Sequence, residues 1–243
     1  MSGTAETLLA ADCIGKRFGE RAVLSAATLA ADRGVVTALV GRNGEGKSTL
    51  LRIMAGLMAP DHGVLRVRGQ VYTRTRLSRL AMQGVFLLPA DRCTLTRTLT
   101  LRQHLDALRR RFGLPPRDEV LQELRITHLL DRGVGTYSGG ERRRAELALA
   151  LVRAPECLLA DEPFLGITPA DTELFTAAFR SLAARGSAIV LTGHEVPFIF
   201  AVADRVTWMT GGSTRPLGDP ETARRDWQFR RDYLGLAARP ARA

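Results

Sequence analysis

A phosphate-binding loop in the first quarter of the chain constrains the fold more than any other feature. The nine residues 41–49 read GRNGEGKST and match the pattern GxxxxGK[ST] at every fixed position. They follow the apolar run 35–40, typical of a buried strand, and lead into residues 47–57, whose apolar side chains recur at helical spacing. A chance glycine-rich turn is the competing interpretation, and the flanking strand and helix argue against it. The sequence therefore predicts a site for a nucleoside triphosphate.

Each fixed position of this loop has a physical role. The glycines allow the backbone to turn its N–H groups toward the phosphates, and the N-terminus of the following helix adds positive potential. The lysine reaches the β and γ phosphates, and the serine hydroxyl binds Mg²⁺. The predicted nucleotide-binding residues are Gly41, Asn43, Gly44, Gly46, Lys47, Ser48 and Thr49, with Ser48 also a metal ligand and Lys47 also catalytic.

A second element of the same site is predicted about a hundred residues later. Residues 156–163 read ECLLADEP, a short apolar strand that ends in two acids, as in a Walker B element. We expect Asp161 to hold Mg²⁺ and Glu162 to orient and deprotonate the attacking water. A plain strand-to-turn junction is the alternative interpretation.

Between these elements, residues 137–144 read YSGGERRR, and with the three motifs in this order the sequence resembles the ATP-binding cassette (ABC) family. The resemblance implies that the nucleotide is ATP. It also implies that Ser138, Gly139 and Gly140, at the start of a helix, cap the γ phosphate bound by the other subunit of a dimer. Each chain then supplies half of each site.

Two further positions match landmarks of that family. Phe18 stands where the family places an aromatic ring that stacks on adenine, although a lone Phe is more often part of a core. His194 follows the apolar run 188–191 and matches the switch histidine that contacts the γ phosphate. The ending at 229–235, FRRDYLG, looks most like the ATPases of lipopolysaccharide export and of branched-chain amino-acid import.

Three positions depart from the family pattern. Ala90 stands where the family has a glutamine that touches Mg²⁺ and the lytic water, so Asp91 or a water molecule would have to replace that contact. Thr168 stands where aspartate is usual, and Glu45 where a small residue is usual. One hypothesis is that the carboxylate missing at Thr168 of one subunit is replaced, across the dimer interface, by that of Glu45 in the other. The alternative is that both positions have drifted on a solvated rim.

Composition and periodicity predict one α/β domain over residues 1–243. The resemblance specifies a P-loop NTPase (RecA-like) core, an antiparallel β subdomain and an inserted helical subdomain at about 92–145. The predicted strands are 8–14, 22–24, 35–40, 64–71, 156–160, 188–191 and 206–209, and the predicted helices are 47–57, 100–112, 117–130, 145–152 and 170–184.

Charge and apolar content bear on partners and location. The formal charge is +10, but all except two of the 35 basic residues are arginines, and their clusters lack the interleaved aromatic residues with which single-strand binders stack bases. We therefore do not expect a nucleic-acid partner; anionic lipid or an acidic partner loop fits at least as well. No run of eighteen apolar residues and no leader occurs, which predicts a cytoplasmic protein, peripheral on the inner face of the cell membrane. The three cysteines, Cys13, Cys93 and Cys157, are far apart and predict reduced thiols.

The resemblance implies an ATPase that uses ATP and Mg²⁺, dimerises with a second copy or a paralogue, and drives separate transmembrane subunits. Those subunits would determine the cargo and the direction of transport. Two alternatives stay open from the sequence. Ala90 and Thr168 are compatible with a weakly hydrolysing regulatory or scaffolding protein, and a soluble ABC protein could act on nucleic acid or the ribosome.

Overall fold

The computed structural model describes residues 6–90 and 94–235, and its centre is a largely parallel sheet around β3 (Val36–Val40). The order across this part is β10-β9-β3-β8-β7-β6, and only β10 runs antiparallel to its neighbour. The other strands are β6 (Val85–Leu88), β7 (Cys157–Ala160), β8 (Ala188–Gly193), β9 (Arg205–Thr210) and β10 (Ser213–Gly218). The carboxyl ends of the parallel strands meet at one edge, which positions the candidate site.

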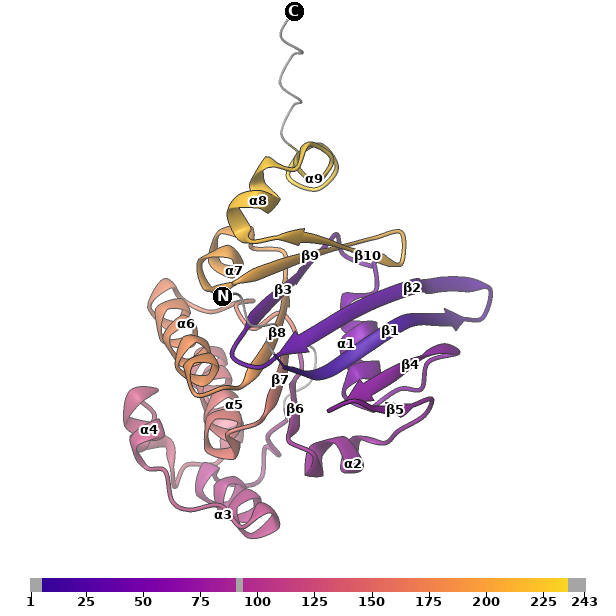
Figure 1. Ribbon diagram of the computed structural model, residues 1–243. Coiled ribbons are helices and arrows are strands. Elements are labelled where there is room, and N and C mark those ends of the chain that lie inside the picture. The colour runs from indigo at the N-terminus through magenta and orange to yellow at the C-terminus, as the bar shows by residue number, and fades with distance from the viewer. Residues whose placement is uncertain (1–5, 91–93, 236–243) are drawn as a thin grey trace, which may run out of the picture.

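Four antiparallel strands extend this sheet in the order β5-β4-β1-β2. They are β1 (Thr7–Phe18), β2 (Arg21–Asp32), β4 (His62–Val67) and β5 (Gln70–Tyr72). The two parts join where Ser213 of β10 pairs with Ala26 of β2. The antiparallel part lies at the right of Figure 1, beside the helix that follows the phosphate-binding loop.

Helices cover both faces of the core strands because successive strand residues point to opposite sides. Val36, Ala38 and Val40 contribute to the hydrophobic core that includes α5 (Gly139–Arg153), α6 (Pro169–Ala184) and α7 (Val196–Val202). Leu39 belongs to a second core, between the core strands and the antiparallel strands, that is filled by α1 (Lys47–Met54). Burial of Leu50, Leu51, Ile53 and Met54 in α1 anchors the loop at its N-terminus.

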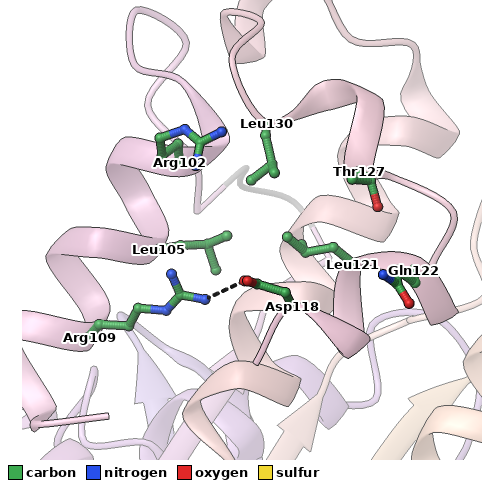
Figure 2. Close-up of a pocket in the computed structure, with 8 residues that line it drawn as sticks. All are labelled: Arg102, Leu105, Arg109, Asp118, Leu121, Gln122, Thr127 and Leu130. Atoms are coloured by element: carbon green, nitrogen blue, oxygen red, sulfur yellow. Dashed lines mark hydrogen bonds and ion pairs between the residues drawn. The ribbon is translucent and has the colours of Figure 1, made fainter. Parts of the chain in front are cut away.

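A helical subdomain lies at the lower left of Figure 1, formed by α3 (Leu101–Phe112), α4 (Glu119–Glu123), two 3₁₀ turns (Thr127–Leu129 and Val134–Thr136) and the start of α5. A cavity of about 150 Å³ lies between α3 and the segment that contains α4. Figure 2 shows the ion pair that bridges it, with Arg109 Nη2 at 3.1 Å from Asp118 Oδ1. Leu105, Leu121 and Leu130 also line the cavity, which is far in sequence from the phosphate-binding loop.

The C-terminal segment returns to the core through aromatic packing. After β10 come α8 (Pro220–Arg225) and α9 (Trp227–Asp232). The Phe229 ring lies 5.6 Å from the Trp208 ring of β9 and 5.0 Å from the Tyr233 ring. These contacts hold Tyr233 near the phosphate-binding loop.

The structure corrects two predicted elements. The strand predicted at 64–71 is a hairpin, because Arg68 and Gly69 both have positive φ angles (47° and 79°) and turn the chain between β4 and β5. The helix predicted at 117–130 stops at Glu123, and Arg125 then adopts φ 54°. The sequence analysis also did not identify α2 (Leu77–Met82), β6, β10, α7, α8 (Pro220–Arg225) or α9 (Trp227–Asp232).

Across residues 6–90 and 94–235, no helix is both long enough and apolar enough to cross a bilayer. Cys157 lies fully buried in β7, and burial raises the pKa of its thiol to about 12. Its thiolate is therefore not available near neutral pH. Cys93 and Asp91 lie outside the described residues.

Candidate functional site

The predicted phosphate-binding loop connects β3 to α1 and leaves the first N–H groups of α1 uncapped. Gly44 and Gly46 have φ angles of 84° and 104°, which only glycine adopts without strain. A Cβ atom on Gly46 would also lie 2.6 Å from Leu24 Cδ2. Gly46 is the N-cap of α1 and offers no side-chain acceptor, so the helix N-terminus remains free to bind an anion.

Lys47 folds back over this loop. Its Nζ donates to the carbonyl oxygens of Gly41 at 2.7 Å and Arg42 at 3.1 Å, and the residue is only 6% exposed. Burial lowers the pKa of Lys47, and the nearby carboxylates of Glu162, Asp161 and Glu45 partly oppose that shift. The ammonium group is thus held where phosphate charge would compensate its desolvation.

A cluster of oxygen atoms lies beside the loop at the end of β7. Asp161 Oδ1 accepts hydrogen bonds from Ser48 Oγ at 3.0 Å and from Thr192 Oγ1 at 2.6 Å. Asp161 is buried. A carboxylate and hydroxyls are the donors that Mg²⁺ prefers, so these residues fit the expected ion.

Glu162 is held at several points directly after Asp161. It adopts a left-handed conformation with φ 48°, and its N–H donates to Thr192 Oγ1 at 3.0 Å. Its Oε2 lies 3.0 Å from Nδ1 of His194, which follows β8. A carboxylate oriented by a histidine beside a phosphate-binding loop is suited to take a proton from a water molecule.

Two hollows flank the phosphate-binding loop. The first, of about 270 Å³, is lined by Arg21, Val23, Asn43, Gly44, Gly46, Lys47, Ser48, Thr49 and Glu162. The second, of about 390 Å³, is lined by Gly41, Arg42, Asn43, His194, Val196, Tyr233 and Leu234. Residues predicted from separate motifs therefore converge on one edge of the sheet, as parallel strands require.

The residues Ser138, Gly139 and Gly140 lie apart from those hollows, at the N-terminus of α5. The Ser138 hydroxyl accepts from Glu141 N at 3.2 Å, and Glu141 Oε2 accepts from Ser138 N at 2.7 Å, which forms a capping box. The Ser138 N–H bond lowers the pKa of Glu141. Gly139 is exposed, and a Cβ atom there would meet nothing within 4 Å. Ser138 and Gly139 are thus exposed at a capped helix end, with free space beside Gly139.

Phe18 does not line either hollow. It ends β1 with 48% exposure, and Lys16 Nζ lies 5.8 Å from its ring centre. Its exposure leaves the ring face available to a base, and its adenine-stacking role remains a prediction.

Glu45 and Thr168, the two residues that suggested an exchange between subunits, both have hydrogen-bond partners within the chain. Glu45 Oε2 accepts from Gly211 N at 2.6 Å, in the turn between β9 and β10. Thr168 caps α6, since its hydroxyl accepts from Asp171 N at 3.2 Å. Each residue therefore has a local structural role that needs no second subunit.

Sequence reasoning missed several residues at this site, and two of them contact Asp161 or Glu162. Thr192 supports both Asp161 and Glu162, and its signal was a hydroxyl in an otherwise apolar buried strand. Arg143 contacts the carbonyls of Ala90 and Glu162, and nothing in its local sequence indicates those distant partners.

Comparison with known proteins identifies sequence relatives along nearly the whole chain. The family model described as ABC transporter matches residues 24–165. A probable ABC transporter ATP-binding protein of Azorhizobium caulinodans is 34% identical over 238 residues, with 96% of this chain and 84% of that protein covered. The lipopolysaccharide export system ATP-binding protein LptB of Haemophilus influenzae is 32% identical, with 94% and 98% covered.

Solved structures of the same kind share the fold. An ATP-binding subunit of an ABC transporter superposes with a TM-score of 0.80 at 26% identity, with 94% of this chain and 97% of that chain covered. A nucleotide-free ATP-binding cassette gives 0.77 at 23% identity, with 94% and 95% covered.

Proposed function

The chain belongs to the ABC transporter family as an ATP-binding, ATP-hydrolysing subunit, and from that premise we propose that two copies close around two ATP molecules and thereby drive separate transmembrane subunits. The observation that carries this proposal is the separation of two half-sites. The phosphate-binding loop, Asp161, Glu162 and His194 share one edge, whereas the open N-terminus of α5 lies outside both hollows. A symmetric dimer supplies the missing half to each site.

The chain's own residues account for the chemistry. Backbone N–H groups of the loop and Lys47 bind the β and γ phosphates, and the uncapped α1 N-terminus adds positive potential. Glu162, oriented by His194, accepts a proton as water attacks the γ phosphorus; the bond to the β-phosphate oxygen breaks, and ADP and phosphate leave. Mg²⁺, held by Asp161 and Ser48, would neutralise charge that develops on the phosphates.

A mixing experiment tests whether the sites are shared between subunits. Lys47→Ala removes one half-site and Ser138→Arg the other, so each purified variant is expected to hydrolyse little ATP. A dimer that contains one copy of each variant has one intact site and one site that carries both substitutions. Random mixing makes half of the dimers of this kind. We therefore expect recovery of about a quarter of the parent activity. Absence of recovery, with the parent protein active, would contradict shared sites.

We propose that the transmembrane partner inserts an apolar segment into a groove of about 620 Å³ between the nucleotide core and the helical subdomain. Its lining includes Leu57, Leu77, Phe112 and Leu149, and Leu57 and Leu77 are 53% and 41% exposed. Pro89 also lines the groove, and its carbonyl accepts from Arg143, which also contacts the carbonyl of Glu162. We infer that the subunit then acts at the inner face of the cell membrane.

Loss of the apolar lining tests this docking surface. Leu57→Glu or Leu77→Glu should abolish co-purification with membrane subunits and leave basal ATP turnover unchanged. Val71→Glu is the matched control, because Val71 is equally exposed but lies on β5, outside the groove lining. Retained co-purification in both groove variants would contradict the assignment.

A further inference from the structure

Arg143, in the second turn of α5, contacts two loops of the nucleotide core at once. Its Nη1 donates to Pro89 O at 2.9 Å, and its Nη2 lies 3.4 Å from Ala90 O and 3.5 Å from Glu162 O. Its side chain is only 14% exposed. One planar guanidinium reaches these carbonyls from two nitrogen atoms, whereas a lysine would have to reach all of them from one.

Glu146 orients this arginine from the next turn of α5. Its Oε2 lies 3.3 Å from Arg143 Nη1, and its side chain is 2% exposed. Its Oε1 accepts from Thr94 N at 2.8 Å. The pair therefore ties α5 to the chain on both sides of residues 91–93, at Ala90 and at Thr94.

These contacts complete the support of the candidate base. Thr192 holds the N–H of Glu162, His194 contacts its carboxylate, and Arg143 contacts its carbonyl. Of these three contacts, only that of Arg143 comes from α5, the helix whose N-terminus carries Ser138. Arg143 is thus a direct contact between α5 and Glu162.

We propose that Arg143, oriented by Glu146, is a positioning residue for ATP hydrolysis that links the Ser138 helix end to Glu162 and to the Ala90 loop; this rests on the proposed role of Glu162. Ala90 has only a methyl group, so its side chain can form no polar link between these parts. Here the link runs through backbone carbonyls and an arginine from α5.

Steady-state kinetics of Arg143→Met tests the proposal, since methionine keeps the aliphatic packing and removes the donors. We expect kcat to fall roughly 10- to 100-fold, because small misplacements of catalytic groups cost this much. KM for ATP and the thermal shift on ATP addition should stay near the parent values. Arg143→Lys should be intermediate, and Arg110→Ala on exposed α3 is the control for lost charge.

Glu146→Gln provides a second arm. It should lower kcat less than Arg143→Met, and combining the two should add no further loss, because both act through one contact. If Arg143→Met does not fold, Arg143→Lys provides the test, and we expect it to show a lower kcat at an unchanged KM for ATP. An unchanged kcat, or a parallel fall of kcat, ATP affinity and melting temperature, would overturn the proposal.

Glu162→Gln measured in parallel separates this inference from the proposed function. An active Glu162→Gln protein would refute the role of Glu162 itself. An inactive Glu162→Gln protein together with fully active Arg143→Met would refute only the role of Arg143.

Discussion

At the scale of single residues, burial and charge place opposing demands on Lys47. The pKa of its ammonium is lowered below 10.5 by burial, so the charged form costs stability at neutral pH in the absence of phosphate. That cost to stability disappears only as pH rises above the pKa that Lys47 has in the unfolded chain. The residue is therefore retained for what it binds rather than for the fold.

Lys47→Met should consequently leave the nucleotide-free protein as stable as the parent or slightly more stable. The stabilisation by ATP should be lost, because the charge that binds the β and γ phosphates is gone. Differential scanning fluorimetry with and without ATP measures both effects. A collapse of the nucleotide-free melting temperature would instead show that the bonds to the Gly41 and Arg42 carbonyls are mainly structural.

Glu45 brings a negative charge into the loop that must receive phosphates. Its carboxylate bonds to Gly211 N and acts on Lys47. Glu45→Gln keeps the acceptor and removes the charge, so ATP affinity should rise by roughly 1.4- to 5-fold at low salt, since partly exposed charge pairs contribute about 0.2–1 kcal/mol. The gain should shrink in high salt.

Glu45→Ala separates the charge from the hydrogen bond. Equal gains in both variants assign the effect to charge, as measured by titration of a fluorescent ATP analogue. Weaker binding in Glu45→Ala alone would show that the tie to Gly211 organises the loop, and weaker binding in both variants would contradict this account.

At the scale of elements, the sequence predicted those whose signal is local and contiguous. The loop 41–49 with α1, and β7 with its two acids, follow from apolar runs and fixed motif positions. The strand predicted at 64–71 was wrong because a turn at Arg68–Gly69 carries only one glycine as its signal. The helix predicted at 117–130 was too long because its apolar spacing continues past Arg125, where the backbone turns.

The same distinction applies to the site. Lys47, Asp161, Glu162 and His194 lie within or directly after recognisable motifs, and the structure brings them together. Support from Arg143 comes through backbone carbonyls, which any residue could supply. Such contacts leave no pattern in a single sequence, and only the packing of α5 on the core reveals them.

The capping box of α5 gives the helix end a predictable acid sensitivity. The hydrogen bond from Ser138 N lowers the pKa of Glu141 in the folded protein below the ordinary value of 4.5. The Glu141 carboxylate therefore contributes its full stabilisation of the fold above pH 4.5, and this contribution is lost as pH falls through the folded pKa. Glu141→Gln should lower the melting temperature by about 1–3 °C near pH 7. The difference should vanish in acid below the folded pKa.

Glu173→Gln, at an exposed position of α6, is the matched control for this titration. A Glu141→Gln difference that is constant from pH 7 into acid would show that the carboxylate charge does not contribute to the cap.

At the scale of the whole molecule, the chain is an ATPase whose relatives are named for different systems. Proteins named for lipopolysaccharide export, Nod factor export and daunorubicin resistance are 32%, 33% and 35% identical to it. Similar identity to subunits of such different systems supports the view that membrane partners define the cargo. We propose that the property they share is the closing of two half-sites around ATP.

Glu162→Gln tests this central claim most directly, because glutamine keeps the size of the side chain and removes the base. The account predicts that ATP turnover falls roughly 10²-fold or more. ATP binding should survive, and an ATP-dependent dimer should accumulate in size-exclusion chromatography with light scattering. Near-parental hydrolysis, or a variant that binds ATP and remains monomeric, would contradict the account.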